Sequence, residues 1–281
     1  MAPSFWPTPQ DYNEAIQNPS VSIADKDLSH GVVETNALGL PKSMTGAFAS
    51  VYKIWAGDKA WAVRCFLSNR SEQQERYRHI SEFVLMDDLE CTVDFHYVEN
   101  GIKIRGEWFP ILKMPWVDGD TLDRYVLKNY QNTELMKSLL SDFHKMMADL
   151  TRAQISHGDL QHGNILMSPQ GLRLVDYDAL YVPALKGKKS LEVGHPSFQH
   201  PERRAKHYDK DVDNFSAWLI HTAILSIAID PDLYTKYCNG DDNLLFRRTD
   251  LAKPDDSEVF ATLLTHSSSH IRSANTLISS H

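Results

Sequence analysis

The sequence predicts an α+β fold in two lobes, in which a β-rich first part precedes a helical second part. Three observations support this prediction. Short runs rich in β-branched and aromatic residues fill residues 48–114, and apolar residues at helical spacing dominate beyond Gly119. A polar stretch, His157–Asn164, lies within the helical part and precedes two short strand-like runs. A chain divided in this way is expected to carry its site in the cleft that joins the lobes.

The composition is that of a soluble globular protein. Of its 281 residues 42% are hydrophobic and 23% are charged, and a net charge of -8 argues against a nucleic-acid partner, which requires a basic face. The most apolar run, Trp218–Ile229, is too short to cross a bilayer, and the N-terminus lacks the pattern of a signal peptide, so we expect no membrane association. Cys65, Cys91 and Cys238 have no metal-binding spacing and indicate reduced thiols in the cytoplasm.

The first part of the chain predicts a lead-in followed by the β-rich lobe. Residues 1–43 are rich in Pro, Asn and Asp and predict an extended segment with little regular structure. The first lobe is predicted over residues 44–114. Its expected elements are strands at 48–54 and 59–66 with a hairpin turn at 56–58, a helix at 71–86 with Ser71 as N-cap, and strands at 93–98 and 108–114, with a turn at 99–101 after the first of these two.

The second lobe is predicted over residues 115–281. Apolar residues at three-to-four spacing predict an amphipathic helix at 135–153, and the apolar run at 213–229 predicts a buried helix. Two short strands are expected at 165–167 and 172–175, directly after the polar stretch.

The strongest chemical signal is an ordered set of three residues. Asp159 and Asn164 share one polar stretch, and Asp176 follows the two short strands. Phosphoryl transfer requires a carboxylate that orients the acceptor hydroxyl and oxygen ligands that hold Mg²⁺ on the phosphates. Asp159 fits the first role, and Asn164 and Asp176 fit the second. Each residue alone would more often cap a turn, but the ordered set favours phosphoryl transfer.

In the order of its motifs the chain resembles the eukaryotic-type Ser/Thr protein kinases. The matching segments are the catalytic loop His157–Asn164, the Asp-Phe-Gly motif at Asp176–Asp178, the end of the activation loop at Gly194–Glu202, the start of the central helix at Asp213, and Arg272 as the partner of Glu202. This resemblance covers about residues 44–280. It implies a bilobal protein-kinase-like fold that uses ATP with Mg²⁺ or Mn²⁺.

The resemblance places a phosphate-binding loop at residues 44–51. Only Gly46 survives of the three glycines that let backbone N–H groups approach phosphate closely. Phe48 is expected to cover the phosphates, and Val51 to begin the strand that covers the nucleotide. Taken alone, the loop also fits an ordinary strand–turn–strand.

The next strand carries Ala62 and Arg64 at the positions of the family's Ala-x-Lys motif. The guanidinium of Arg64 is a wide planar fork where lysine offers a compact charge, so its contact with the phosphates would differ. The resemblance implies a glutamate partner for Arg64 on the helix at 71–86. Glu82 has the more family-like spacing, and Glu75, two turns earlier on the same helical face, is the alternative.

The resemblance implies that residues 112–119 join the lobes. Met114 would border the adenine pocket, and the Pro115 carbonyl and Val117 N–H would pair with adenine. A plain strand that ends in a loop is equally consistent with these residues.

Regulation by phosphorylation of the activation loop is not expected. The position of the arginine that grips a phosphorylated loop in many kinases is occupied by Gly158. The apolar content of residues 177–185 predicts a loop that is held by packing.

Several phrases are similar to a bacterial group of kinase-like proteins. They are AVRCF, ERYRHIS, HGDLQHGNIL, LVDYDALYVPAL and GHPSFQHPERR. In that group Arg replaces the Lys, and Asp-Tyr-Asp replaces Asp-Phe-Gly. The resemblance implies a von Willebrand A-domain protein and a PP2C-type phosphatase as partners.

These observations favour an ATP- and Mg²⁺-dependent bacterial Ser/Thr protein kinase whose protein substrate is not specified by the sequence. One alternative is a pseudokinase that binds a nucleotide or acts as a scaffold, which Arg64 and the single Gly46 favour. Another is a small-molecule phosphotransferase, because the form His157-Gly158-Asp159 is also typical of aminoglycoside and choline phosphotransferases.

Overall fold

The computed structural model describes residues 5–46, 48–68, 72–87, 89–238 and 243–279. The chain forms two compact units, which are described separately below. The first comprises Met1–Asp88 and Val93–Val117, and the second comprises Leu89–Thr92 and Asp118–His281. The first unit is rich in sheet and the second is mainly helical, which confirms the predicted α+β class. In the described parts of the chain, no helix has both the length and the apolar character that crossing a membrane requires.

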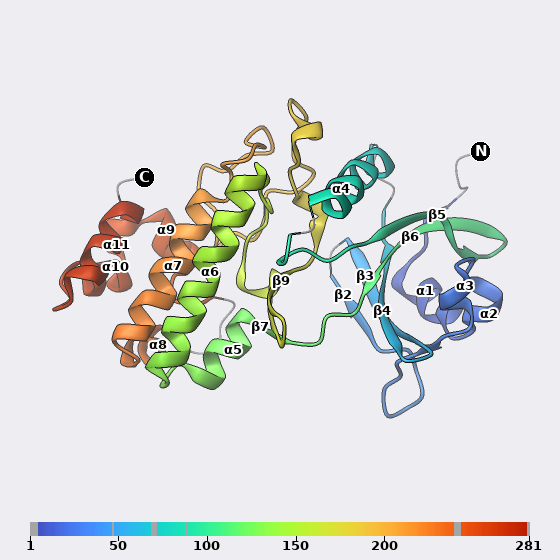
Figure 1. Ribbon diagram of the computed structural model, residues 1–281, viewed down its shortest axis with the longest axis horizontal. Coiled ribbons are helices and arrows are strands. Elements are labelled where there is room, and N and C mark those ends of the chain that lie inside the picture. The colour runs from blue at the N-terminus through green and yellow to red at the C-terminus, as the bar shows by residue number, and fades with distance from the viewer. Residues whose placement is uncertain (1–4, 47, 69–71, 88, 239–242, 280–281) are drawn as a thin grey trace. The chain divides into compact units, whose positions relative to one another are not determined.

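The first unit contains an antiparallel sheet of six strands in the order β1-β3-β4-β6-β5, with β2 paired to β3 (Figure 1). The strands are β1 (Val32–Val33), β2 (Ser43–Thr45), β3 (Ala49–Ala56), β4 (Lys59–Phe66), β5 (His96–Ile104) and β6 (Glu107–Pro115). The hairpin of β3 and β4 and the position of β6 lie close to their predicted bounds.

Strand register divides this sheet into two faces with different roles. Val63 of β4 pairs with Tyr52 of β3 and is fully buried, as is Tyr52. Neighbouring residues along a strand point to opposite faces, so Ala62 and Arg64 lie on the other face of the sheet. One face therefore forms the hydrophobic core of the unit, and the other carries the residues that we predicted to bind a nucleotide.

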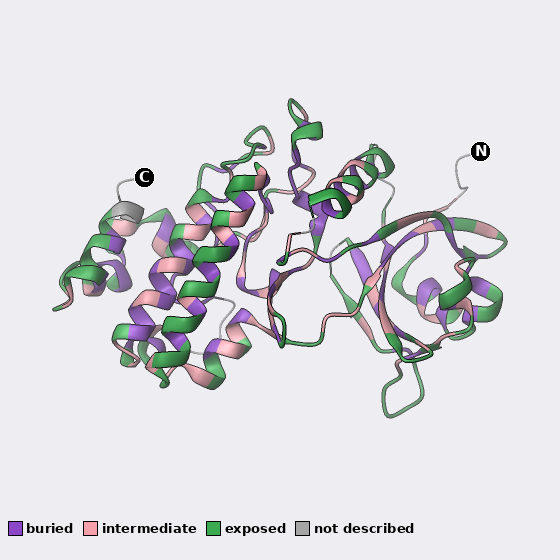
Figure 2. Cartoon of the chain, viewed as in Figure 1, coloured by how far each residue is buried: buried purple, intermediate pink, exposed green. Residues whose placement is uncertain are grey.

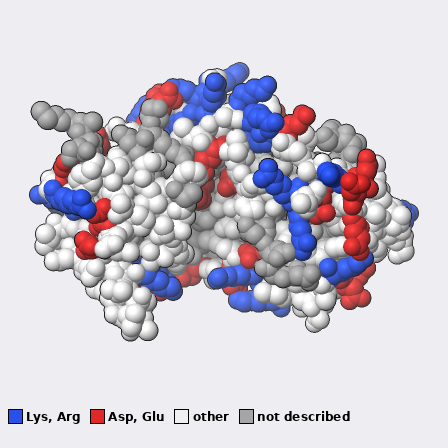
Figure 3. All heavy atoms as spheres, turned by 180° about the vertical axis from the view of Figure 1, so that it is seen from behind, with Lys and Arg blue, Asp and Glu red and all other residues white. Residues whose placement is uncertain are grey.

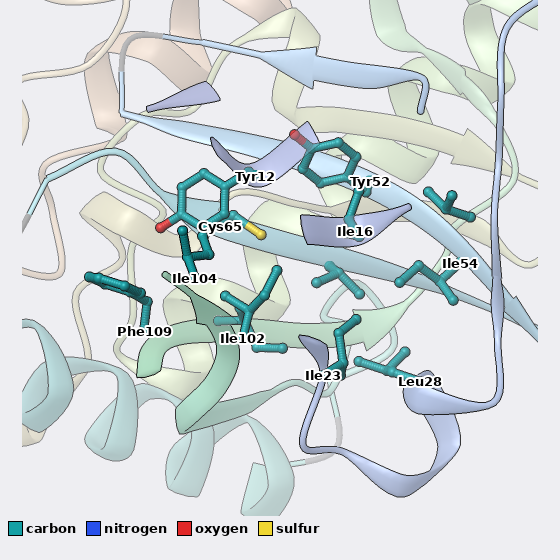
Figure 4. Close-up of a cluster of buried hydrophobic side chains, with 13 residues drawn as sticks. Tyr12, Ile16, Ile23, Leu28, Tyr52, Ile54, Cys65, Ile102, Ile104 and Phe109 are labelled. Atoms are coloured by element: carbon teal, nitrogen blue, oxygen red, sulfur yellow. The ribbon is translucent and has the colours of Figure 1, made fainter. Parts of the chain in front are cut away.

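The N-terminal segment supplies five of the 13 buried residues of this core, which corrects the prediction of an extended lead-in. It folds into α1 (Pro9–Ile16), α2 (Pro19–Ser22) and α3 (Lys26–Ser29). Tyr12 and Ile16 of α1 pack with Ile102 of β5 and with Cys65 of β4 (Figure 4). The prolines mislead because Pro is favourable in the first turn of a helix, where its missing N–H would have no partner.

The remaining helix of the first unit is α4 (Gln73–Asp87), close to its predicted bounds. Tyr77 of α4 packs against Phe66, Phe95 and Tyr97, with ring centroids 5.5–6.0 Å apart. The proposed N-cap, Ser71, lies outside the described residues.

The turn expected at residues 99–101 is wrong. Strand β5 continues through it with a shift of register between Val98 and Ile102, and the chain reverses instead at Arg105 and Gly106. A Cβ placed on Gly101 would lie 2.3 Å from the Ile111 side chain. A glycine there serves close packing of the bulged strand rather than a turn.

The second unit is built around two long helices that lie side by side, α6 (Thr133–Ala153) and α7 (Asn214–Ile229) (Figure 1). Figure 2 shows that buried residues dominate along α7, whereas α6 also has an exposed face. A small antiparallel sheet has the order β7-β8-β9. The other elements are β7 (Asp120–Thr121), α5 (Leu122–Asn129), β8 (Ile165–Ser168), β9 (Gly171–Leu174), α8 (Asp232–Tyr237), α9 (Arg248–Ala252), α10 (Glu258–Leu264) and α11 (Ser269–Ser279).

Candidate active site

Asp213, which directly precedes α7, holds the loop before β8 through hydrogen bonds to its backbone. The Asp213 carboxylate accepts the backbone N–H of His157 and, at 2.9 Å, the backbone N–H of Gly158. Asp213 is 3% exposed, and burial raises the pKa of its carboxyl against the opposing effects of His157, of the two N–H donors and of Arg203. The buried helix α7 thus fixes the backbone of the catalytic loop one residue before Asp159.

Gly158 could not be replaced by a residue with a side chain without a change in the loop. Its φ of +77° lies in the left-handed region, and a Cβ would lie 2.1 Å from the carbonyl oxygen of Ala179. The glycine that we interpreted as the loss of a regulatory arginine is therefore also a requirement of the local backbone.

Asp159 and Asn164 form one hydrogen-bonded group, as their spacing predicted. The Asn164 amide nitrogen donates to the main-chain carbonyl of Asp159 at 2.9 Å and to Oδ2 of the same residue at 3.1 Å. The other carboxylate oxygen of Asp159 accepts the backbone N–H of His195 at 2.6 Å. The carboxylate is thus fixed by two donors while Asp159 stays half-buried.

Asp176 joins this group through the backbone. The N–H of Val175 donates to the main-chain carbonyl of Asn164 at 3.0 Å, and Nε2 of His157 lies 2.9 Å from the carbonyl of Val175. Asp176 itself is exposed and has a φ of +67°. A residue other than glycine in this region carries strain, and such strain gathers at functional sites. The structure therefore brings Asp159, Asn164 and Asp176 together within the second unit.

Tyr177 and Asp178 replace the Phe and Gly of the family motif, and both are buried. The Tyr177 hydroxyl donates to the carbonyl of Leu174 at 2.8 Å, which satisfies its polar group inside the unit. Tyr181, Val182 and Leu185 that follow are at most 6% exposed. This confirms that the start of the segment is held by packing.

The predicted nucleotide residues of the first unit share one face of its sheet. Val51 pairs with Arg64, and Ala62 pairs with Met114 of β6, so the side chains of each pair lie on the same face. Phe48 and Gly46 precede β3 and are exposed, and the position between them, residue 47, lies outside the described residues. A Cβ at Gly46 would meet nothing within 4 Å, so the surviving glycine is not required for packing.

The segment after β6 keeps its strand-like pairing for one more residue. The Trp116 N–H donates to the carbonyl of Ala60 at 2.9 Å, which aligns Pro115 beside Trp61. Pro115 is exposed and Val117 is half-buried.

Neither candidate glutamate of α4 is buried. Glu82 binds Arg78 at 2.9 Å with its side chain 54% exposed, and Glu75 lies 3.9 Å from His79. Both contacts run along the helix, to residues four positions away.

The expected ion pair between Glu202 and Arg272 does not form among the described residues. Both residues are exposed, and the Arg272 guanidinium donates to the carbonyls of His266 and Ser267. Arg203, the residue that follows Glu202, is a buried cation and is 8% exposed. Burial lowers the pKa of Arg203, and Asp213, Asp209 and Asp159 oppose that effect.

Sequence reasoning missed two residues near Asp159. His195 supplies the N–H that fixes the carboxylate, and Arg203 is a buried cation whose pKa is influenced by Asp213, Asp209 and Asp159. The signal for His195 was Gly194, whose virtual Cβ lies 2.8 Å from Oδ1 of Asp159 and whose φ is +81°. A glycine at this position lets the side chains of Asp159 and Gln199 approach the backbone closely.

Comparison with known proteins agrees with this geometry. The protein kinase domain family matches residues 44–229. Among solved structures, the kinase PK-1 of the Cydia pomonella granulovirus is similar, with a TM-score of 0.51 and 19% identity over 72% of this chain and 70% of that chain. At this level of identity the likeness shows the fold alone. A comparison with curated proteins finds no match.

The fold of the two units and the family match define a kinase-type domain. The chain belongs to the protein kinase domain family.

Proposed function

We propose that this protein is an active Ser/Thr protein kinase of bacterial origin that transfers the γ-phosphoryl group of ATP to a protein hydroxyl. The observation that carries the proposal is the hydrogen-bonded group of Asp159, Asn164 and Val175, which holds Asp176 beside the catalytic loop. All three residues Asp159, Asn164 and Asp176 are present. Asp213, which directly precedes the buried helix α7, fixes the loop residue Gly158 before Asp159. A scaffold without catalysis would not require this arrangement.

Asp159 acts on the acceptor in this proposal. Its carboxylate, fixed by His195 and Asn164, would accept a hydrogen bond from the substrate hydroxyl and orient the oxygen for attack. As the bond between this oxygen and the γ-phosphorus forms, the bond from the γ-phosphorus to the oxygen that bridges it to the β-phosphorus would break and ADP would leave. The hydroxyl proton would pass to the Asp159 carboxylate.

Asn164 and Asp176 would hold a divalent cation. Both hydrogen bonds of the Asn164 side chain among the described residues use its nitrogen, so its oxygen is the atom suited to Mg²⁺. Asp176 is exposed at the end of β9 and offers carboxylate oxygens, which suit the same ion. Bound Mg²⁺ would neutralise charge on the phosphates during transfer.

Arg64, together with Val51, Ala62 and Met114 on the same sheet face, would bind the nucleotide. Arginine at this position is the observation that favours the pseudokinase alternative. The substitution Arg64→Lys separates the two: in an active kinase we expect it to retain or raise transfer, and Arg64→Ala to lower it. Equal activity of wild type, Arg64→Lys and Arg64→Ala would remove Arg64 from the site.

The direct test of the proposed function is transfer of label from γ-labelled ATP with Mg²⁺ or Mn²⁺ to the protein itself and to generic protein substrates. We expect labelled serine or threonine, lost in Asp159→Ala. Absence of any difference between wild type and Asp159→Ala would overturn the proposal. The von Willebrand A-domain and PP2C-type partners stay predictions of the resemblance, testable by co-purification.

A further inference from the structure

One segment of the second unit carries the opposite charge from the chain as a whole. Residues 183–210 hold seven Lys and Arg residues against three Asp and Glu residues, a net charge of +4, in a chain whose net charge is -8. Most of these basic side chains are exposed. Figure 3 shows Lys and Arg side chains gathered along the upper edge of the molecule, where the segment after β9 reaches in Figure 1.

The backbone brings two basic stretches of this segment together. The N–H of Ser190 donates to the carbonyl of Ala205 at 2.9 Å. Ser190 directly follows two lysines, and Ala205 lies between an arginine and a lysine. We define the basic cluster as Lys186, Lys188, Lys189, Arg204 and Lys206.

The same segment is anchored to the catalytic loop at Asp159 and at His162. The His195 N–H binds the Asp159 carboxylate, and the ring of Phe198 stacks on His162 with centroids 4.8 Å apart. The buried hydroxyl of Ser216 donates to the Phe198 carbonyl at 2.6 Å. The basic cluster therefore belongs to a segment whose residues His195 and Phe198 are fixed to the catalytic loop and to α7.

We propose that the basic cluster binds an acidic segment of the protein substrate, so that acceptor serines or threonines flanked by Asp and Glu are preferred. The inference rests on the proposed function and specifies its substrate class. Like charges held close together on a surface repel one another and attract an anionic partner at long range. A short acidic peptide fits better than a nucleic acid, because the remainder of the chain is acidic and repels an extended polyanion.

The test compares two labelled peptides of equal length, each with one serine, flanked by Glu in one and by Gln in the other. Fluorescence anisotropy measures binding to wild type and to the double variant Lys186→Glu with Lys206→Glu, both exposed positions. We expect wild type to bind the Glu peptide about tenfold more tightly than the Gln peptide and the double variant to lose this preference. Raising the salt concentration from about 0.05 M to about 0.3 M should weaken the preference.

A control variant carries the same change of net charge elsewhere in the second unit. Lys137→Glu with Lys253→Glu alters two exposed lysines outside residues 183–210 and should keep the preference. Equal binding of both peptides by wild type, or equal loss in both double variants, would overturn the inference. Tighter binding of a single-stranded RNA than of the Glu peptide, lost in the Lys186→Glu, Lys206→Glu variant, would overturn it in favour of a nucleic-acid surface.

Phosphoryl transfer to the two peptides separates this inference from the proposed function. Transfer to both peptides without a binding preference would contradict the acidic-substrate inference alone. Preferential binding of the Glu peptide without transfer to either peptide would contradict the kinase activity and leave the binding surface supported.

Discussion

The carboxylate of Asp213 accepts the backbone N–H of Gly158 at 2.9 Å, so the buried helix α7 fixes the position of the catalytic loop. Both Asp213 oxygens are used, since the N–H of His157 binds the other one. The loop residues that carry the proposed chemistry are therefore supported from the core of the second unit.

The substitution Asp213→Asn should destabilise the protein strongly. The side-chain oxygen of an asparagine could accept a hydrogen bond from only one of the two backbone N–H groups. The asparagine NH2 group would then face the other N–H group. An unsatisfied buried donor costs about 1–3 kcal/mol, so we expect a loss of stability of about that size. Thermal unfolding measures the effect, and Asp211→Asn, an exposed aspartate nearby, is the matched control. Similar melting temperatures for the two variants would contradict the role of Asp213.

Restoring an arginine at position 158 should not create regulation by phosphorylation. A side chain there meets the Ala179 carbonyl and must adopt a left-handed backbone, which alone costs about 1–2 kcal/mol. We expect Gly158→Arg and Gly158→Ala to be destabilised alike. Gly163→Ala is the control in the same loop, because its Cβ would meet only the flexible Gln161 side chain, at 3.1 Å. A Gly158→Arg protein as stable as wild type would refute this account.

The N-terminal segment is fastened to β6 by a buried lysine. The Lys113 ammonium donates to Asp25 and Asp27 at 2.8 Å each and lies 4.3 Å from the centroid of the Trp61 ring. Replacing it by methionine should cost about 1–3 kcal/mol, because Asp25 and Asp27 lose their ammonium partner.

A double-mutant cycle tests this pair. Adding Asp25→Asn to Lys113→Met should recover part of the loss, whereas strictly additive effects in chemical unfolding would show that the pair is not coupled. The pKa of Asp27 is lowered by its hydrogen bond with Lys113. The stabilisation from that carboxylate is therefore present above its unfolded value of 3.8 and is lost as the pH falls below it.

Two histidines where α6 meets α7 should make stability depend on pH. Nε2 of His144 lies 2.7 Å from Nδ1 of His221, and burial, followed by His144, lowers the pKa of His221 from 6.5. Because the folded state binds the proton less well than the unfolded state, stability should fall as the pH drops below 6.5.

The variant His221→Phe keeps a ring at this position and cannot take up the proton. We expect its melting temperature to change less than that of wild type between neutral and mildly acidic pH. His270→Phe, at an exposed position, should behave like wild type. An unchanged pH response in His221→Phe would show that other groups control it.

The sequence predicted the grouping of the candidate site residues in the second unit better than the architecture of the first unit. Asp159, Asn164 and Asp176 are joined by local hydrogen bonds over short spacings, which a motif captures. The helix at Pro9 carried a signal that we missed, since Thr8 and Asp11 form a capping box around it. Its burial against Cys65 and Ile102 depends on contacts distant in sequence, which no local pattern reveals.

Two other predictions from the sequence were also wrong. Asn100-Gly101 has the composition of a turn, but pairing of β5 with β6 carries the strand through it as a bulge. Arg272 was assigned to Glu202 by analogy, whereas helix α11 directs it to nearby carbonyls. Tertiary strand pairing decides the first case, whereas the Arg272 contacts are local, since they reach carbonyls five and six residues earlier.

The central claim is that Asp159 supports phosphoryl transfer, and intact-protein mass spectrometry tests it most directly. Wild type and Asp159→Asn, which retains an oxygen to accept the His195 N–H, are incubated with ATP and Mg²⁺ or Mn²⁺ together with a mixture of protein substrates. The account predicts added phosphate on serine or threonine in the wild-type reaction and none with Asp159→Asn. Addition of AMP, or identical spectra for the two proteins, would contradict it.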